Sequence, residues 1–298
     1  MTLRLLVTGR HGQVASALVE RTAFHAGFEV IAAGRPELDL EHPETVAPAI
    51  VAASPDIVVN AAAFTAVDKA ESEEPRATLV NRDGAAAAAR AAHQLGVPFI
   101  HLSTDYVYPG GKPTPYIESD ATGPLGAYGR SKLAGELAVR AAHPQALIFR
   151  TAWVYSPFGA NFVRTMLRVG GERPSLSVVD DQIGNPTSAL DIAEAILRIA
   201  PTLSGKTGGG TYHLAGEGSV SWCGFAREIF RLSAVRGGPS PEVEAIATAQ
   251  YPTPAKRPAN SRLDTSAFQA RFGFGLRPWA VALGDTVNRL LPPAKHQT

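Results

Sequence analysis

Short apolar runs alternate with amphipathic segments through the first half of the chain. The runs predict buried β-strands over residues 3–8, 28–33, 57–60, 99–103 and 147–151. The amphipathic segments predict helices over residues 13–25, 44–53, 76–95 and 128–142. Strands that are apolar on both faces and alternate with helices are typical of a parallel sheet covered on both sides. We therefore expect an α/β fold built on a doubly wound parallel sheet.

The second half of the chain is less regular. Its patterns predict helices over residues 161–169, 190–200 and 222–233 and strands over 176–179 and 211–214. Proline and glycine become frequent from 237 to 258, which predicts loops there. We expect a nucleotide-binding domain over residues 1–155, with chain returning to it around 185–215. Residues 156–298 should form mainly a smaller α/β C-terminal substrate lobe.

Composition and charge narrow the classes of function. Of 298 residues, 45% are hydrophobic and 18% charged, which is typical of a globular protein. A net charge of +1 gives no electrostatic reason to expect a nucleic acid or an anionic membrane as partner. The single cysteine, Cys223, allows neither an internal disulfide nor a thiolate metal cluster. Residues 1–7 are too short an apolar run for a signal peptide and no stretch resembles a membrane span, which predicts a cytoplasmic protein.

A glycine-rich segment lies between the first predicted strand and the first helix. Its pattern is Gly-x-x-Gly-x-x-Ala over residues 9–15. Glycines let the backbone approach a pyrophosphate, which then rests on the helix N-terminus, and a small residue permits close helix–strand packing. An ordinary strand-to-helix turn is the alternative, but the position after the first strand favours a dinucleotide. The cofactor-binding residues expected from this segment are Gly9, Arg10, His11, Gly12, Gln13 and Val14.

The end of the second strand bears on the choice of cofactor. NAD sites usually carry an acidic residue there, which binds the ribose 2′-hydroxyl. Here the sequence reads Ala33-Gly34-Arg35. Arginine is a bidentate phosphate ligand, so Arg35 favours the 2′-phosphate of NADPH, with NADH as the alternative. A solvated loop charge is the competing interpretation of Arg35. Asp39 and Leu40, which follow, could border the adenine, although a solvated aspartate is nearly as common.

Two residues four apart on the predicted helix 128–142 are candidates for acid–base chemistry. Tyr128 and Lys132 share one helix face. An ammonium beside a phenol should lower the phenol pKa from its usual value of roughly 10, toward that of a useful acid at neutral pH. A chance surface pair is the alternative, because this spacing is common.

Hydroxyl groups and small side chains follow two other strands. Ser103-Thr104-Asp105 ends the strand that begins at Phe99, and ligands of open α/β sheets bind outside such carboxyl ends. The Thr104 hydroxyl could hold a substrate carbonyl, or Thr104 could be a simple turn residue. Small side chains after Asn60 leave room for a flat cofactor, and Asn60 itself could tie neighbouring loops together. Thr65 and Val67 could reach the site.

At this point the sequence resembles a known family. The glycine pattern, Ser103-Thr104-Asp105 and Tyr128-x-x-x-Lys132 together resemble the extended short-chain dehydrogenase/reductases. Longer strings resemble the dTDP-4-dehydrorhamnose reductases. These strings lie at residues 60–71, 103–108, 128–136, 149–155, 161–162, 181–187, 212–216 and 257–261. The resemblance covers nearly the whole chain and implies a Rossmann-like dinucleotide domain.

The resemblance also implies an activity. NADPH would reduce the C4 ketone of dTDP-4-dehydro-L-rhamnose, the last step of dTDP-L-rhamnose synthesis. Tyr128 would be the proton donor, Lys132 would hold the nicotinamide ribose and Thr104 would tune the carbonyl end. Arg10, His11 and Gly12 would wrap the pyrophosphate. Nucleotide-bordering residues implied by the family are Asp39, Leu40, Ala62, Ala63 and Thr65, and sugar-site residues are Thr104, Asp105 and Trp153, whose indole face would pack on the ring.

One departure from the family concerns magnesium. Some members carry glutamates that bind this metal at a dimer interface, and the equivalent positions here are Ala15, Leu190 and Pro292. None has a side chain that can ligate a metal, so no metal is expected and the protein is a monomer or a homodimer. Two alternatives to the reductase stay open. One is another nucleotide-sugar ketoreductase, and the other is a non-catalytic NADP-binding regulatory subunit of methionine adenosyltransferase.

Overall fold

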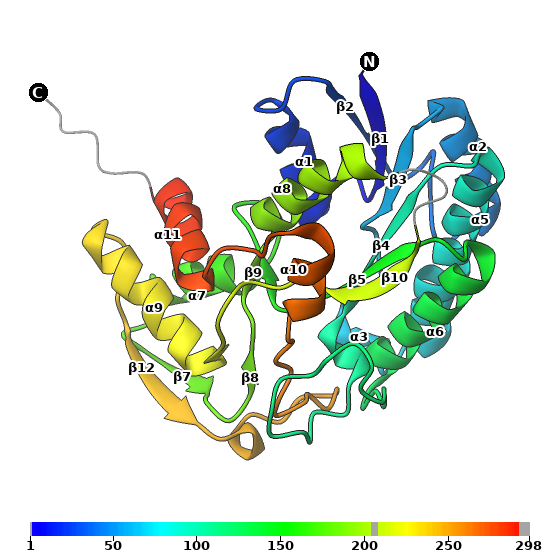
Figure 1. Ribbon diagram of the computed structural model, residues 1–298. Helices are drawn as coiled ribbons and strands as arrows, with labels where there is room; N and C mark the ends of the chain where they lie inside the picture. The colour runs from blue at the N-terminus through cyan, green and yellow to red at the C-terminus, as the bar shows by residue number, and fades with distance from the viewer. Residues whose placement is uncertain (1, 204–207, 292–298) are drawn as a thin grey trace, which may run out of the picture.

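A six-stranded parallel sheet forms the centre of the molecule (Figure 1). The computed structural model describes residues 2–203 and 208–291. The strand order is β10-β5-β4-β3-β1-β2, and every neighbouring pair is parallel. The strands are β1 (Leu3–Thr8), β2 (Phe28–Ala33), β3 (Ile57–Asn60), β4 (Phe99–Thr104), β5 (Leu147–Thr151) and β10 (Gly210–His213). This is the doubly wound Rossmann-like sheet that the apolar runs predict, and that expectation is confirmed.

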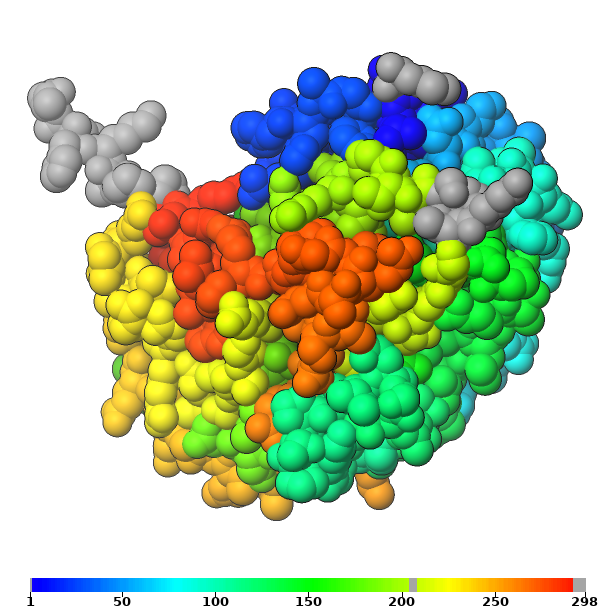
Figure 2. All heavy atoms as spheres, viewed as in Figure 1, coloured from blue at the N-terminus to red at the C-terminus, as the bar shows by residue number. Residues whose placement is uncertain are grey.

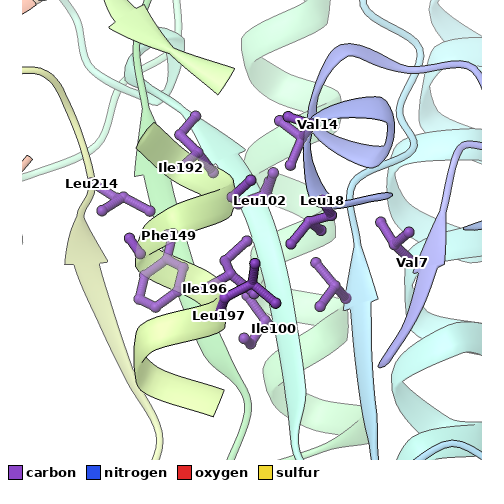
Figure 3. Packing of buried hydrophobic residues seen from close by; sticks show 14 of the residues in the cluster. Val7, Val14, Leu18, Ile100, Leu102, Phe149, Ile192, Ile196, Leu197 and Leu214 are labelled. Carbon is purple, nitrogen blue, oxygen red and sulfur yellow. The ribbon is translucent and has the colours of Figure 1, made fainter. Parts of the chain in front are cut away.

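One face of the sheet is covered by helices that are far apart in the sequence. These are α1 (Gln13–Thr22) and α8 (Ala189–Ile199), with α10 (Ser266–Phe272) at the edge. Figure 3 shows Leu18 of α1 and Ile196 of α8 meeting side chains of the strands. Successive side chains of a strand point to opposite faces, so Leu5 and Val7 of β1 contribute to this core. The chain therefore returns to the first domain through α8 and β10.

The opposite face is covered by α2 (Pro43–Ala53), α5 (Ala85–Leu95) and α6 (Ala127–Ala142). Leu6 of β1 and Val58 of β3 point to this side. Seven alanines of α5 are buried, and their small side chains let α5 lie close to the sheet and to α2 and α6. The alanine-rich stretch is thus a packing surface.

The expected continuous helix over residues 76–95 is wrong. The structure has α4 (Glu74–Thr78), a π-helical segment η1 (Leu79–Gly84) and then α5. A Cβ at Gly84 would lie 2.3 Å from the Leu40 carbonyl oxygen, so the π turn is pressed against a neighbouring loop. Tertiary packing of this kind has no local sequence signal. The first helix also ends at Thr22 instead of residue 25.

The second lobe is built from short paired strands and three helices. The helices are α7 (Phe162–Gly170), α9 (Trp222–Val235) and α11 (Trp279–Leu290). The strand pairs are β7 (Ser175–Val179) with β12 (Glu242–Ile246), β8 (Ile183–Gly184) with β11 (Val220–Ser221), and β6 (Val154–Tyr155) with β9 (Thr187–Ser188). Short elements complete the described chain: α3 (Val67–Ala70), η2 (Asp105–Val107), η3 (Ala200–Thr202) and η4 (Thr248–Gln250).

The prediction of loops over residues 237–258 is wrong for β12, which pairs in parallel with β7. Val243 of β12 packs on the small core formed by Leu176, Val178 and Phe230. β12 thus combines this apolar contact with parallel pairing to β7 over five residues, in spite of the surrounding prolines and glycines. On the face shown in Figure 2, the yellow and red segments lie at the left, the orange segment with α10 lies at the centre, and the blue N-terminal segment lies at the top.

The division into domains at residue 155 stays a prediction, and residues 204–207 of the expected return lie outside the described residues. Within the described part of the chain, no helix has the length and apolar character needed to cross a membrane.

Candidate active site

The glycine-rich segment forms a turn at the carboxyl end of β1. Gly9 adopts φ +93°, in the left-handed region that favours glycine, and a Cβ there would lie 3.3 Å from Ala62. The Gly12 N–H donates to the Gly9 carbonyl at 2.7 Å. Helix α1 then begins without a side-chain cap and without an acidic residue in its first turn. Its N–H groups and positive dipole end therefore remain available for an anion, at the switch point between β1 and β3.

The residues of this turn differ in exposure and in their contacts. Arg10 and His11 are exposed, whereas the Val14 side chain is buried in the core under α1. Gln13 points toward the second lobe: its Oε1 accepts from Ser156 at 2.8 Å, and its Nε2 donates to the Val154 carbonyl at 3.3 Å. Gln13 and Val14 can therefore meet a pyrophosphate only through their backbone, and the Gln13 side chain joins the two lobes.

Two arginines lie at the end of β2. Arg35 is exposed in the turn after the strand. Arg10 crosses beside it, because Gly34 leaves room: a Cβ at Gly34 would lie 2.9 Å from the Arg10 Cβ. Arg10 is paired with Glu37 at 2.8 Å. The positive charges of Arg35 and Arg10 therefore both lie at this edge, next to the end of β2.

Asp39 and Leu40 have structural contacts that the sequence does not reveal. The Asp39 carboxylate accepts from the backbone N–H of Glu41 at 3.0 Å, which holds the turn before α2. The Leu40 side chain is buried in the core between the sheet and α5. Leu40 can therefore border a nucleotide only through its backbone.

A hydrogen-bonded chain fixes the edge at β3. The Thr8 hydroxyl donates to the Asn60 carboxamide oxygen at 2.6 Å and accepts from the backbone N–H of Ala62 at 3.0 Å. The Asn60 amide nitrogen lies 2.9 Å from His101 Nδ1. Asn60 thus ties β1, β3 and β4 together, where the sequence suggests a tie between neighbouring loops. Small half-buried side chains at Ala62 and Ala63 follow, then exposed Thr65 and half-buried Val67 at the start of α3.

Tyr128 lies in the first turn of α6, facing the end of β4. It is half-buried, and its ring packs edge-on against Tyr106 with 5.7 Å between centroids. Burial raises the pKa of Tyr128 to about 12, although the neighbouring Thr104 hydroxyl offsets part of the rise. The prediction that Lys132 lowers this pKa is wrong for the ligand-free protein, because the cost of burying a phenolate is larger. Tyr128 therefore carries its proton at neutral pH.

Lys132 is fully buried one turn further along α6. Its Nζ donates to the Leu102 carbonyl at 2.7 Å, and this is its one hydrogen bond among the described residues. Burial lowers the pKa of Lys132 to about 8, and the carboxylate of Glu136 opposes that change. An ammonium has three donors. Lys132 can thus hold a further oxygen, such as a ribose hydroxyl, while the pH stays below about 8.

Thr104 and Asp105 close the end of β4. The Thr104 hydroxyl donates to Asp105 Oδ1 at 3.0 Å and accepts from the backbone N–H of Tyr106 at 3.2 Å. Asp105 is buried, and its Oδ2 has no hydrogen-bond partner within the described residues. Burial raises the pKa of Asp105 to about 7, opposed by the hydroxyls of Ser261 and Thr104. An unsatisfied buried oxygen beside Tyr128 is suited to bind a substrate hydroxyl.

Trp153 follows β5 and is half-buried. Its ring stacks in parallel on Trp222 of α9, with 3.5 Å between centroids and 4° between planes. One indole face is therefore covered by protein. A sugar can meet only the other face or the edge of the ring, which narrows the expected packing of the indole on the sugar.

Sequence reasoning missed a buried ion pair below Lys132. Arg150 of β5 binds Glu136 of α6 through two bonds, Nη2 to Oε2 at 2.6 Å and Nε to Oε1 at 2.9 Å. The Ser103 hydroxyl donates to the same carboxylate at 2.5 Å. The pair thus joins β5 to α6 and β4, the two elements that hold Tyr128, Lys132 and Thr104. The only signal in the sequence is that Glu136 lies four residues after Lys132, on the same helix face.

A second missed contact supports the backbone of Tyr128. The Asn81 amide in the π-helical segment donates to Ser131 Oγ at 2.9 Å, and Ser131 donates to the Tyr128 carbonyl at 2.8 Å. A Cβ at Gly135 would lie 2.1 Å from the Asn81 carbonyl oxygen, so η1 and α6 are pressed together here. The π segment thereby positions the first turn of α6.

The positions considered for magnesium are apolar where the structure describes them. Ala15 is buried in α1 and Leu190 in α8, while Pro292 lies outside the described residues. Over residues 2–203 and 208–291, no group of three His, Cys, Asp or Glu side chains is placed to hold a metal ion.

The chain is similar to known proteins over nearly its whole length. The family model described as the RmlD substrate binding domain matches residues 3–291. The dTDP-4-dehydrorhamnose reductase of Sinorhizobium fredii is 50% identical over 98% of this chain and 99% of its own length.

Solved structures of dTDP-4-dehydrorhamnose reductases are also similar to this chain. A dTDP-4-dehydrorhamnose reductase from Clostridium acetobutylicum is 35% identical, with a TM-score of 0.89 over 97% of this chain and 99% of that one. The enzyme from Bacillus anthracis, solved in complex with NADP, is 32% identical, with a TM-score of 0.90 over 97% of this chain and 100% of that one.

Proposed function

The chain belongs to the dTDP-4-dehydrorhamnose reductase family, and from that premise we propose that it reduces the C4 ketone of dTDP-4-dehydro-L-rhamnose with NADPH. The observation that carries the proposal is the cluster of Tyr128, Thr104 and Lys132 at the carboxyl end of β4. This cluster lies in a sheet whose first strand leads to the free N-terminus of α1. Such an arrangement suits transfer to a carbonyl from a bound dinucleotide.

The described residues fit NADPH. The turn at Gly9 and the uncapped start of α1 would hold the pyrophosphate, and Arg35 with Arg10 would hold the 2′-phosphate. Lys132 would hold the nicotinamide ribose through its unused donors. A relative is solved with NADP, which supports the same cofactor here. When bound, the nicotinamide supplies the hydride that reduces the ketone carbon.

Tyr128 supplies the proton. Reduction at C4 leaves negative charge on the ketone oxygen, and a general acid must neutralise it. With its pKa raised to about 12 by burial, the Tyr128 phenol holds a proton at neutral pH and gives it to that oxygen. The phenolate that remains lies one helix turn from the Lys132 ammonium, which stabilises it. Thr104 lies at the same carbonyl end, with its hydroxyl proton donated to Asp105, and Asp105 Oδ2 and Trp153 bind the sugar.

The oligomeric state and the cellular location are two further predictions. A monomer or homodimer and a cytoplasmic location are both compatible with the described residues. They would be checked by light scattering of the purified protein and by cell fractionation.

The test is NADPH oxidation in the presence of dTDP-4-dehydro-L-rhamnose. We expect turnover by the wild-type protein, and a fall in kcat of about 10²- to 10⁴-fold in Tyr128→Phe with NADPH affinity unchanged. Tyr212→Phe is the matched control, since this tyrosine is half-buried like Tyr128 and packs on Phe149 and Phe272. Normal NADPH binding without turnover would contradict the proposed activity. A fast Tyr128→Phe variant would contradict only the role of Tyr128.

A further inference from the structure

The backbone of Trp153 is held in a conformation that tryptophan rarely adopts. Its φ is +46°, in the left-handed region, and among the described non-glycine residues only Ser54 shares a positive φ. Such strain persists only where the surrounding structure fixes the residue, and it clusters at functional sites. The contacts that fix Trp153 therefore bear on the site to which it belongs.

Trp222 provides the support on one side. The two indoles lie 3.5 Å apart and within 4° of parallel. Phe162 packs against Trp222 in a tilted arrangement, with 4.6 Å between the ring centroids. Trp222 is also the first residue of α9, and Ser221 caps that helix by accepting from the Gly224 N–H at 3.0 Å. The supporting ring is thus fixed both by its helix and by its neighbour.

Gly184 provides the space on another side. A Cβ at Gly184 would lie 2.5 Å from Trp153 Cε2 and 2.6 Å from its Nε1, so no side chain fits there. The same point is 2.7 Å from Ser261 Oγ, which brings the indole N–H edge close to the hydroxyl beside Asp105. Gly184 in β8 pairs with Val220 in β11, two residues before Trp222. One small strand pair therefore forms the slot that holds the indole.

The indole N–H group forms the polar edge of the Trp153 side chain. Its Nε1 donates to no acceptor within residues 2–203 and 208–291, although it lies in the same region as the unsatisfied Asp105 Oδ2. An indole N–H and a carboxyl oxygen, set near each other, can bind vicinal sugar hydroxyls. Position and direction matter for such contacts, because a hydrogen bond weakens steeply as its angle departs from linear.

We propose that Trp222 is a positioning residue for substrate: it holds Trp153 so that the indole N–H edge binds a hydroxyl of the nucleotide-linked sugar. Gly184 sets the same position by leaving the slot open. The inference rests on the proposed function, because Trp153 can bind a sugar only if a nucleotide sugar is the substrate. The slot that holds the indole is formed by residues of the second lobe. We therefore expect changes in the slot to alter sugar binding and to leave cofactor binding unaffected.

Circular dichroism tests the stack itself without any ligand. Two indoles this close couple excitonically, and a rotation of one ring relative to the other within the stack gives a paired positive and negative band in the far ultraviolet. We expect this couplet in the wild-type protein and its loss in Trp222→Phe. The chain has three tryptophans, so Trp279→Phe is the matched control, and it should keep the couplet because Trp279 packs on Phe225. A couplet that survives unchanged in Trp222→Phe would overturn the inference.

Steady-state kinetics then test whether the loss of Trp222 weakens substrate binding. In Trp222→Ala we expect KM for dTDP-4-dehydro-L-rhamnose to rise roughly 3- to 10-fold, with NADPH affinity and kcat little changed. Trp222→Phe, which restores a ring, should return KM to within about twofold of wild type. A purely structural loss would lower the active fraction without changing KM. An unchanged KM in Trp222→Ala would overturn the inference, whereas no turnover by the wild-type protein would contradict the proposed function.

Discussion

The buried pair of Arg150 and Glu136 should contribute more to stability than any exposed pair of the same chemistry. The two side chains are 7% and 5% exposed. Glu136→Gln leaves the guanidinium without a counter-charge inside the protein, a change that typically costs about 3–5 kcal/mol. Because glutamine keeps one acceptor oxygen for Arg150 or Ser103, we expect the lower end, about 3 kcal/mol of the free energy of unfolding.

The matched control is an exposed pair with the same residue types. Arg168 and Glu172 lie 3.0 Å apart on the surface, and their side chains are 65% and 54% exposed. Solvent screens such a pair, so Glu172→Gln should cost less than about 0.5 kcal/mol. Urea unfolding followed by circular dichroism measures both variants. The double variant Glu136→Gln with Arg150→Met should recover part of the loss, because it removes the unpaired charge. Equal losses in the two single variants would refute the reasoning.

Three further predictions concern the cofactor and the pH. Arg35→Ala should weaken NADPH binding more than NADH binding in fluorescence titrations, and equal losses would refute the 2′-phosphate role. NADPH affinity should fall as the pH rises through about 8, where buried Lys132 loses its charge, and Lys132→Met should lack this pH dependence; a flat wild-type profile would contradict it. Asp105 has its pKa raised to about 7, so the folded state binds more protons than the unfolded state and stability should fall as the pH rises from about 4 to about 7. Asp105→Asn should not show this fall in urea unfolding.

Local sequence patterns were sufficient to predict the central sheet. The strands from β1 to β5 are short apolar runs, and each is bounded by turn residues or by a helix start. Their order along the chain, with helices between them, implies a parallel sheet whose carboxyl ends gather the site. Gly9, Thr104 and Tyr128 could be assigned because each lies at such a boundary.

The remaining features depend on contacts between distant segments. The π turn at Asn81 exists because Gly84 and Gly135 are pressed against other parts of the chain, and nothing in the local helical pattern records that. Strand β12 is ordered by Val243 on the core of the second lobe, among residues that otherwise predict loops. The direction of the Tyr128 pKa shift was also missed, because the spacing to Lys132 suggests an ion beside the phenol but does not reveal the burial of both.

The part of the site contributed by the second lobe was the hardest to predict. Trp222, Gly184 and Ser261 come from distant parts of the sequence and meet Trp153 and Asp105 only in the folded protein. A glycine that must leave space for an indole is indistinguishable, in one sequence, from a glycine in an ordinary turn.

Transfer of a deuterium label tests the central claim most directly. The protein would be mixed with NADPH deuterated at the transferable position of the nicotinamide and with dTDP-4-dehydro-L-rhamnose, and the product examined by nuclear magnetic resonance. We expect one deuterium at C4 of dTDP-L-rhamnose, with the hydroxyl proton drawn from solvent through Tyr128. An unlabelled product, a label at another carbon or unchanged ketosugar would contradict the account.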